Sequence, residues 1–204
     1  MIPPFPQAVL FDMDGTILNP INDGLLEFKI RWDIPSDQLI VPSLPNLPDQ
    51  ASDEYNRLAE FEAVNSTLRD GVRELLEFLE AAHIKTALVT NNSGSSMNTV
   101  LAKHQIRFDL GLSRDDAPMK PAPDMLLLAL EKLEVSPGHA IMVGDTRPDV
   151  GAAQNAKIPL CLLLAEPWNV ALEVQEAGFQ ALRLRGIAQV REHLQRTHAL
   201  TSVV

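Results

Sequence analysis

Two aspartates with one residue between them are the most informative feature of this sequence. Asp12 and Asp14 follow a short apolar run, residues 8–11, and precede Gly15. A run of this length is typical of a strand buried on both faces of a parallel sheet, and in extended backbone residues two apart point to the same side. Carboxylates that share a crevice can act as nucleophiles, exchange protons or ligate a hard cation. Alternatively, both aspartates could simply cap the next element.

Other polar side chains follow further apolar runs along the chain. Residues 84–89 lead into Thr90 and Asn91, and residues 140–143 lead towards Asp145. Open parallel sheets bind ligands beyond the carboxyl ends of their strands, where these side chains are expected. In chain order, the candidate site residues are two acids, a hydroxyl, an amide, a cation and two more acids: Asp12, Asp14, Thr90, Asn91, Lys120, Asp145 and Asp149.

This order of groups resembles the four motifs of the haloacid dehalogenase-like (HAD) hydrolase superfamily. Those motifs read DxDGT, a Thr or Ser at a strand tip, a Lys, and GDxxxD, and they correspond here to residues 12–16, Thr90, Lys120 and residues 144–149. The match spans residues 7–165, and four motifs in order are more specific than any one of them. The chain is similar to the phosphoglycolate phosphatase branch. Dehalogenases lack the second aspartate of the first motif, so its presence here argues against C–Cl cleavage.

The resemblance implies a two-step phosphatase with Asp12 as the nucleophile. A carboxylate that attacks phosphorus gives an aspartyl-phosphate and splits one difficult hydrolysis into two easier steps. Because the attacking carboxylate and the phosphate repel each other, the site needs a hard cation, and Mg²⁺ is expected as the cofactor. Asp12 and Asp145 would ligate it, and the resemblance adds the backbone carbonyl of Asp14. The Asp14 side chain could then protonate the leaving alkoxide and deprotonate the attacking water.

The remaining motif residues are expected to hold the phosphoryl group. Thr90, the Asn91 amide and Lys120 would donate to its oxygens and stabilise the charge in the transition state. Lys120 could instead be a solvated loop lysine, and Thr90 and Asn91 could be ordinary turn formers. Asp149 could support the metal or cap a helix that begins near Pro148. The backbone N–H groups of residues 92–94 could add an anion site.

Composition bounds the class of protein. The 204 residues are 46% hydrophobic with a formal charge of −10, which fits one globular domain with room for an insertion. A sequence pI near 4.9 argues against nucleic acid and anionic membranes as partners. The longest apolar stretch, residues 158–165, is shorter than the roughly 20 residues of a spanning helix. No positive region precedes the first apolar run, as a secretory signal would require.

The cysteine and the histidines are not expected to do chemistry. The single cysteine, Cys161, can form no internal disulfide, which indicates a reducing cytoplasm, and its apolar neighbours predict a core position. The five histidines lack metal-ligand spacing and are expected at the surface or at helix ends: His83, His104, His139, His193 and His198. A zinc site is therefore not predicted.

Alternating strand and helix patterns predict an α/β fold, a doubly wound parallel sheet with helices on both faces. The resemblance implies the Rossmann-like HAD core. Strands are predicted at residues 7–12, 84–90, 107–112, 140–144 and 159–164, and helices at 71–82, 95–104, 123–134 and 148–156. Beyond Trp168, the patterns predict a helix at 169–177, an edge strand at 180–184, a closing helix at 187–197 and a frayed tail at 201–204.

Residues 19–69 interrupt this alternation. Two helical patterns, residues 23–32 and 49–64, flank a proline-rich stretch at residues 41–48. Because the segment leaves the sheet beside Asp12, it is a candidate lid, and the resemblance implies a small helical cap. A structureless loop of this length would be unusual in a compact domain. The predicted division is a core of residues 1–18 and 70–204 with a cap of residues 19–69.

The resulting interpretation is a Mg²⁺-dependent phosphatase acting on a small phosphorylated metabolite. One alternative is a phosphomutase resembling β-phosphoglucomutase, although holding a sugar diphosphate while it reorients demands a larger cap. Another is a non-catalytic phospholigand-binding module, which has no need of a nucleophile. The first motif leads into Asn19 and Pro20, where many cap-bearing relatives have an acid and a serine, so no substrate is assigned. Lys29, Arg31 and Arg57 could reach an anionic substrate or be solvated charges.

Overall fold

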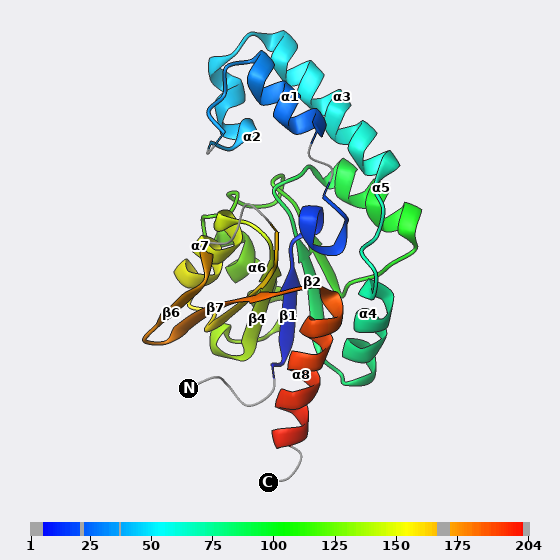
Figure 1. Cartoon of the computed structure of the whole chain (residues 1–204), viewed down its shortest axis with the longest axis vertical. Coiled ribbons are helices and arrows are strands. Elements are labelled where there is room, and N and C mark those ends of the chain that lie inside the picture. The colour runs from blue at the N-terminus through cyan, green and yellow to red at the C-terminus, as the bar shows by residue number, and fades with distance from the viewer. Residues whose placement is uncertain (1–5, 21–22, 37, 167–171, 202–204) are drawn as a thin grey trace.

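A computed structural model describes residues 6–20, 23–36, 38–166 and 172–201 and shows an α/β fold built on one seven-stranded sheet (Figure 1). The strand order is β3-β2-β1-β4-β5-β7-β6, and every neighbouring pair is parallel except β7 with β6. The strands are β1 (Ala8–Phe11), β2 (Lys85–Val89), β3 (Leu110–Leu112), β4 (Ala140–Gly144), β5 (Leu160–Leu164), β6 (Val174–Glu176) and β7 (Phe179–Leu184). The predicted α/β class is therefore confirmed.

Helices cover both faces of the sheet, because alternate residues of each buried strand enter different cores. In β1, Ala8 and Leu10 pack on one side, and Val9 and Phe11 pack on the other. The first core includes α6 (Asp124–Leu133) and α7 (Arg147–Asn155), and the second includes α4 (Val72–Ala81), α5 (Gly94–His104) and α8 (Ile187–Thr201). The sheet is thus doubly wound, as predicted, and the strand order puts β1 and its aspartates at the centre.

The C-terminal region differs from the prediction. The expected helix at residues 169–177 is wrong for residues 174–176, which form β6, and residues 167–171 lie outside the described part of the chain. A two-residue turn joins β6 to β7, and its Gly178 has a φ of 86°, which glycine adopts without steric cost. This hairpin places β7 inside the sheet, between β5 and β6, rather than at the predicted edge.

The closing helix α8 is confirmed and is longer than predicted, because it continues to Thr201. The predicted frayed tail falls mostly on residues 202–204, which lie outside the described residues. Within the part of the chain that the structure describes, none of the helices has the length and apolar character needed to cross a membrane.

The segment between β1 and α4 forms a compact helical unit. It contains α1 (Asp23–Arg31), α2 (Ile40–Ser43), η2 (Leu44–Asn46) and α3 (Asp49–Asn65). The proline-rich stretch is therefore not a plain separator, because Pro42 and Pro45 lie in short helical turns. The unit has its own apolar core, centred on Phe28, Tyr55 and Ala59. Two aromatic contacts stabilise this core: the ring centroid of Phe28 lies 5.8 Å from that of Tyr55 and 6.2 Å from that of Trp32.

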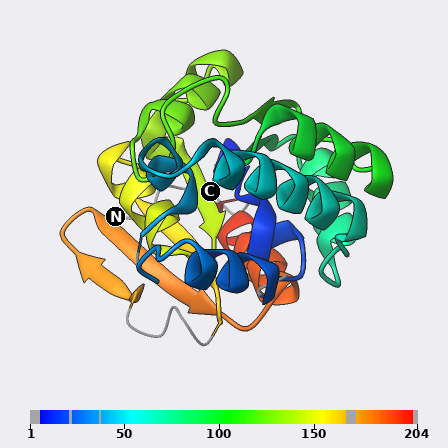
Figure 2. The same ribbon diagram turned by 90° about the horizontal axis from the view of Figure 1, so that it is seen from above.

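This helical unit lies beyond the carboxyl ends of the strands (Figure 1), and seen from above it covers the centre of the sheet (Figure 2). Its two connections to the core run side by side. Leu18 and Leu68 form an antiparallel bridge, and hydrogen bonds of 2.9 Å join the Asn19 N–H to the Thr67 carbonyl and the Arg69 N–H to the Ile17 carbonyl. The paired connections hold the base of the unit next to the end of β1.

Candidate active site

Three of the predicted acids meet beyond the ends of β1 and β4. Oxygens of Asp12, Asp145 and Asp149 all lie within 4.8 Å of one another, and their residues are 8%, 2% and 0% exposed. Asp12 directly follows β1, while Asp145 follows β4 and Asp149 lies in the first turn of α7. Among the described residues this is the one group of His, Cys, Asp and Glu side chains that could hold a metal ion.

Lys120 supplies a buried cation to this group. Its residue is 2% exposed, and its Nζ lies 2.6 Å from Asp12 Oδ1 and 2.7 Å from Asp149 Oδ1. Burial alone would lower the pKa of Lys120, but the charges of Asp12 and Asp149 raise it above its usual range. Lys120 is therefore a protonated, buried and paired lysine. The alternative of a solvated loop lysine is wrong.

Three carboxylates against one ammonium leave the centre with excess negative charge. Burial raises the pKa of Asp12 to about 7, although Lys120 opposes the shift. Burial also raises the pKa of Asp145 to about 8, and the charges of Asp12 and Asp149 add to that shift. A divalent cation bound here would favour the ionised carboxylates. Oxygen donors with surplus negative charge therefore fit a hard metal ion.

Asp149 also has a structural role. Its Oδ2 accepts hydrogen bonds from the Thr146 N–H at 2.9 Å and the Thr146 hydroxyl at 2.6 Å, which completes a capping box at the start of α7. The same oxygen accepts from the Asp145 N–H at 3.3 Å. Gly144 allows this approach, because a Cβ there would lie 2.5 Å from the Asp149 Cβ. Asp149 thus caps α7 and pairs with Lys120 beside the possible metal ligands.

Asp14 lies at the mouth of the crevice. The chain leaves the extended conformation after Asp12 and enters an irregular helical turn, η1 (Met13–Ile17). The expectation that Asp12 and Asp14 point to the same side of one strand therefore does not apply. The two acids are nevertheless close, since the charge of Asp14 raises the pKa of Asp12. Asp14 Oδ2 accepts a 2.6 Å hydrogen bond from the Asn92 side-chain amide. Desolvation by the surrounding protein raises the pKa of Asp14 to about 6, although the residue remains exposed at the mouth of the crevice.

The turn after Asp12 is held by contacts that the sequence analysis did not single out. Thr16 donates its hydroxyl to Asp145 Oδ1 at 3.2 Å. Gly15 has a φ of 72°, and a Cβ there would lie 2.3 Å from Asp145 Oδ2, so glycine is required for two reasons. Arg69 donates to the Gly15 carbonyl through Nη2 at 2.7 Å and Nε at 3.1 Å, and it forms an ion pair with Glu166.

Thr90 and Asn91 occupy the strand end next to this turn. Thr90 is 1% exposed, and its hydroxyl accepts the Asn92 N–H at 3.1 Å. The Asn91 amide forms two 2.9 Å hydrogen bonds with the backbone N–H and carbonyl of Lys120. The Asn91 side chain therefore fixes the Lys120 loop, and the geometry supports a positioning role for it. Of the backbone donors proposed as an anion site, Asn92 N–H bonds to Thr90, and Gly94 N–H bonds to Asp115 at 2.8 Å.

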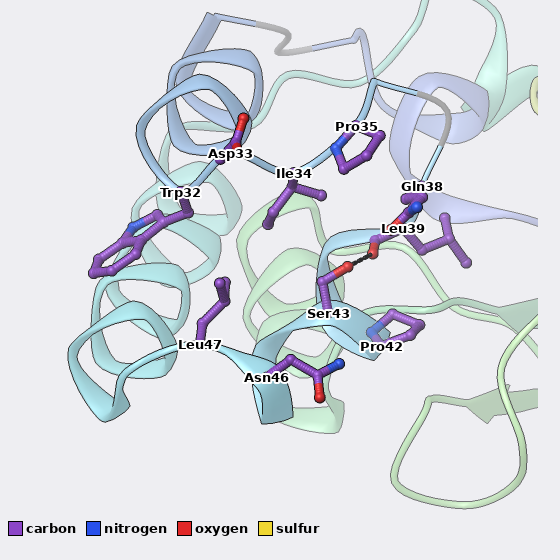
Figure 3. Close-up of a pocket in the computed structure, with 10 residues that line it drawn as sticks. All are labelled: Trp32, Asp33, Ile34, Pro35, Gln38, Leu39, Pro42, Ser43, Asn46 and Leu47. Atoms are coloured by element: carbon purple, nitrogen blue, oxygen red, sulfur yellow. Dashed lines mark hydrogen bonds between the residues drawn. The ribbon is translucent and has the colours of Figure 1, made fainter.

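Two of the three cations suggested for substrate binding lie in contacts within the insertion. Lys29 Nζ donates to the Ser36 carbonyl at 2.8 Å, and Arg31 pairs with Glu54 at 2.7 Å. Arg57 is exposed on α3. A cavity of about 410 Å³ lies within the insertion (Figure 3), but none of its ten lining residues belongs to the acid and lysine cluster. The chemistry is therefore concentrated at the ends of the strands.

The prediction for the cysteine agrees with the structure, and two of the histidines have identified partners. Cys161 is fully buried in β5, and burial raises the pKa of its thiol well above the usual value, so it is a core residue as predicted. His104 and His139 each pair with a serine, through Nε2 with Ser66 at 2.9 Å and through Nδ1 with Ser136 at 2.7 Å. No histidine joins a metal-binding group within the described residues.

Known proteins are similar to this chain in sequence and in fold. Residues 32–163 match the family model described as haloacid dehalogenase-like hydrolase. A phosphoglycolate phosphatase of Vibrio vulnificus is 30% identical over an alignment of 182 residues that covers 74% of this chain and 80% of the relative. A putative pyrophosphatase, PpaX, of Clostridium perfringens is 30% identical over 177 residues, covering 76% and 82%. The solved structure of a putative phosphoglycolate phosphatase from Lactobacillus plantarum shares the fold, with a TM-score of 0.72, 23% identity and coverage of 92% and 99%.

Proposed function

Because the chain belongs to the haloacid dehalogenase-like hydrolase family, we propose that it is a Mg²⁺-dependent phosphatase that hydrolyses a small phosphorylated metabolite through an aspartyl-phosphate. The observation that carries this proposal is the position of Asp12 beside a buried ammonium and two buried carboxylates, with Asp14 at the mouth of the same crevice. The names of the relatives, phosphoglycolate phosphatase and pyrophosphatase, agree with phosphoryl chemistry.

In the first step, an oxygen of Asp12 attacks phosphorus, and the bond from phosphorus to the leaving oxygen breaks. Asp14 in its protonated form gives its proton to that oxygen. Lys120, which lies 2.6 Å from Asp12, and the buried hydroxyl of Thr90 would stabilise charge on the transferring group. In the second step, the ionised Asp14 takes a proton from a water molecule that attacks the aspartyl-phosphate and releases inorganic phosphate. A pKa of about 6 suits Asp14 to both steps near neutral pH.

Asp12 and Asp145 are the proposed protein ligands of Mg²⁺, and the family resemblance adds the Asp14 carbonyl. Asp149 supports the site from the side, since its two oxygens already accept hydrogen bonds from Lys120 and from the start of α7. Bound Mg²⁺ would reduce the repulsion between the nucleophile and the phosphate. Thr16 and Gly15 then act as positioning residues, because they hold Asp145 against the turn that follows Asp12.

We assign residues 19–69 as a small cap over a core of residues 1–18 and 70–204. The separate apolar core of α1–α3 and its place beyond the strand ends support this division. A cap in this position would limit access of water and select the leaving group of the substrate. No specific contact among the described residues favours a phosphomutase or a non-catalytic binding module over a hydrolase.

Turnover of p-nitrophenyl phosphate by the purified protein tests the proposal. We expect hydrolysis with Mg²⁺ and its loss after chelation. Asp12→Asn should lower turnover by at least about 10³-fold, because the amide is a poor nucleophile and a poor metal ligand. Radiolabelled phosphate from the substrate should remain on acid-quenched wild-type protein and should be missing from Asp12→Asn.

Asp53→Asn is the matched control, because it makes the same change on the exposed surface of α3. It should leave turnover and labelling as in the wild type. A folded Asp12→Asn variant that retains a tenth of the wild-type turnover would refute Asp12 as the nucleophile.

A further inference from the structure

We propose that Arg114, in the loop after β3, binds an anionic group on the leaving group of the substrate and thereby determines specificity. The substrate class would be phosphate monoesters and anhydrides whose leaving group carries a carboxylate or a second phosphate. This inference rests on the proposed function, since it concerns the same crevice. It does not depend on the identity of the biological metabolite.

The backbone of Arg114 is fixed to the active-site loop. Its N–H donates to the Asn92 carbonyl at 3.0 Å, and the Asn92 side chain holds Asp14 at 2.6 Å. The two acids that follow Arg114 accept hydrogen bonds from residues of the loops around it. Asp115 accepts the Gly94 N–H at 2.8 Å, and Asp116 accepts the N–H and the hydroxyl of Ser113, both at 2.8 Å. The backbone of Arg114 is therefore hydrogen-bonded directly to Asn92, the partner of the proposed general acid.

The guanidinium of Arg114 reaches the insertion. Its Cζ lies 5.6 Å from the ring centroid of Tyr55 in α3, and that ring is fixed because it is 6% exposed and packs edge-on against Phe28. The Nη1 atom is buried and has no hydrogen-bond partner among the described residues, and no carboxylate of the described residues forms an ion pair with Arg114. A buried charged donor without a partner is unfavourable, so it indicates a place that a ligand completes.

Tyr55 connects Arg114 to Asp14, on the side of the crevice that faces the insertion. Burial raises the pKa of Tyr55, the charge of Arg114 opposes that shift, and the charges of Asp14 and Glu62 add to it. The Tyr55 hydroxyl therefore lies within electrostatic range of all three side chains. Because Asp14 must reach the leaving oxygen, the rest of the leaving group would extend from Asp14 towards Tyr55 and Arg114. The loop of Arg114 also lines a cavity of about 420 Å³ that it shares with Val41 of the insertion.

The charges on this side of the crevice favour an anion near Arg114. The ammonium of Lys120 is held at the strand ends by Asp12 and Asp149, so it does not compete for an anionic group near Arg114. A guanidinium can bind a carboxylate or a phosphate through two parallel hydrogen bonds. Glu62 opposes an anion when it is ionised, but burial raises its pKa to about 7, and its protonated form can donate a hydrogen bond. A leaving group with an anion and a neighbouring hydroxyl or ester oxygen would match both side chains.

The competing explanation is that Arg114 only holds α3 against the core. The two explanations differ in their dependence on the substrate. Loss of a structural contact should impair every substrate equally, whereas loss of an anion-binding group should impair anionic leaving groups more.

The experiment measures kcat/KM for matched compounds. Phosphoglycolate and pyrophosphate have anionic leaving groups, and 2-hydroxyethyl phosphate replaces the carboxylate of phosphoglycolate by a neutral group. The wild-type protein should prefer at least one anionic compound over the neutral ester. Arg114→Gln should reduce that preference by about 10- to 100-fold, the range expected for a hydrogen bond to a charged group. Arg114→Lys should keep part of it, and free guanidinium should rescue Arg114→Ala more on the anionic compound.

Arg107→Gln is the control, since it removes the same charge from an exposed position before β3. It should leave the preference unchanged. Loss of preference for phosphoglycolate alone would identify a carboxylate as the ligand, and loss for pyrophosphate alone would identify a phosphate. Equal loss on anionic and neutral compounds, or no preference in the wild type, would overturn the proposal.

Calorimetric binding to Asp12→Asn separates this proposal from the proposed function. In that background, Arg114→Gln should weaken binding of phosphoglycolate more than binding of 2-hydroxyethyl phosphate. Absence of turnover together with this difference in affinity would refute the phosphatase and retain Arg114 as an anion-binding residue. Equal affinities for phosphoglycolate in Asp12→Asn with and without Arg114→Gln would refute Arg114 as an anion-binding residue.

Discussion

Asp14 is the residue whose environment most directly suits proton transfer. Its carboxylate accepts a 2.6 Å hydrogen bond from Asn92, which would lower its pKa, yet the surrounding protein raises that pKa to about 6. Asn92 therefore orients the carboxylate without keeping it permanently ionised. Because Asn92 immediately follows the Thr90 and Asn91 strand end, the loop that would hold the phosphoryl group also positions the proposed acid.

Asp14→Asn tests this role through the leaving group. The variant should slow phosphorylation by an alkyl phosphate about 10² to 10⁴-fold, the usual range for general acid catalysis, and slow phosphorylation by an aryl phosphate much less. Aryl oxides leave without a proton more readily than alkoxides. Single-turnover rates of the phosphorylation step with ethyl phosphate and p-nitrophenyl phosphate measure the difference. The same loss on both compounds would exclude Asp14 as the general acid.

Among the elements, the turn η1 depends on Arg69, which lies where the insertion returns to the core. Arg69 joins the Gly15 carbonyl to Glu166 in the segment after β5, and the side chains of this ion pair are 16% and 14% exposed. The contact therefore links three loops at the strand ends. It also holds the connection of the insertion beside the proposed nucleophile.

Arg69→Ala should lower both stability and activity. Loss of partly buried charged hydrogen bonds should cost about 1–3 kcal/mol, which corresponds to a fall in Tm of roughly 2–10 °C in a chain of this size. We expect kcat/KM for p-nitrophenyl phosphate to fall by about tenfold, because the turn that carries Asp14 loosens. Thermal unfolding and steady-state kinetics measure the two effects.

Arg196→Ala is the matched control, since its ion pair with Glu192 is 3.6 Å long and lies on the surface of α8. An exposed pair of this kind contributes about 0–1 kcal/mol. Similar changes in Tm and activity for the two variants would contradict a special role of Arg69.

At the scale of the whole molecule, the buried carboxylates make stability depend on pH and metal. The pKa of Asp145 is raised from 3.8 to about 8 in the folded protein. Between these values the folded protein binds more protons at this group than the unfolded chain, so its contribution to the free energy of unfolding decreases as pH rises. At pH 8 and above, the metal-free protein should therefore have lost most of this contribution, because Asp145 ionises while it is buried and close to Asp12 and Asp149, and Mg²⁺ should restore stability.

Mg²⁺ should raise the Tm of the wild type, and the increase should be larger at pH 8 than at pH 6. At ten times its Kd, a ligand of the folded state adds about 1.4 kcal/mol, or roughly 3–6 °C for a chain of this size. Asp145→Asn should raise the Tm of the metal-free protein at pH 8 and remove most of the response to Mg²⁺. Its amide can still accept the Thr16 hydrogen bond, so the fold should persist.

Asp53→Asn removes an exposed carboxylate of α3 and should leave the Mg²⁺ response intact. If the Mg²⁺-dependent Tm curves of Asp145→Asn and wild type coincide, Asp145 is not a ligand.

The sequence alone determined the α/β fold and the chain order of the candidate residues. Apolar runs that end in polar residues predict strand ends, and all strand ends of a parallel sheet meet at one edge. The proximity of Asp12 and Asp145 could therefore be predicted from the sequence. The same reasoning failed where the local pattern was ambiguous. Residues 174–176 fit a helical pattern in the sequence, but the turn at Gly178 pairs them with β7 as a strand.

Only the tertiary structure decided which side chains touch. Asn91 pairs with the Lys120 backbone, Asn92 pairs with Asp14, and Arg114 reaches Tyr55 across residues far apart in the chain. Lys29 and Arg31, two of the three cations suggested for substrate binding, pair with other residues of the insertion. Such contacts depend on how loops from different elements pack, and the local residue pattern does not specify those distances. Sequence therefore determined the expected chemistry, whereas the fold determined which groups can carry it out together.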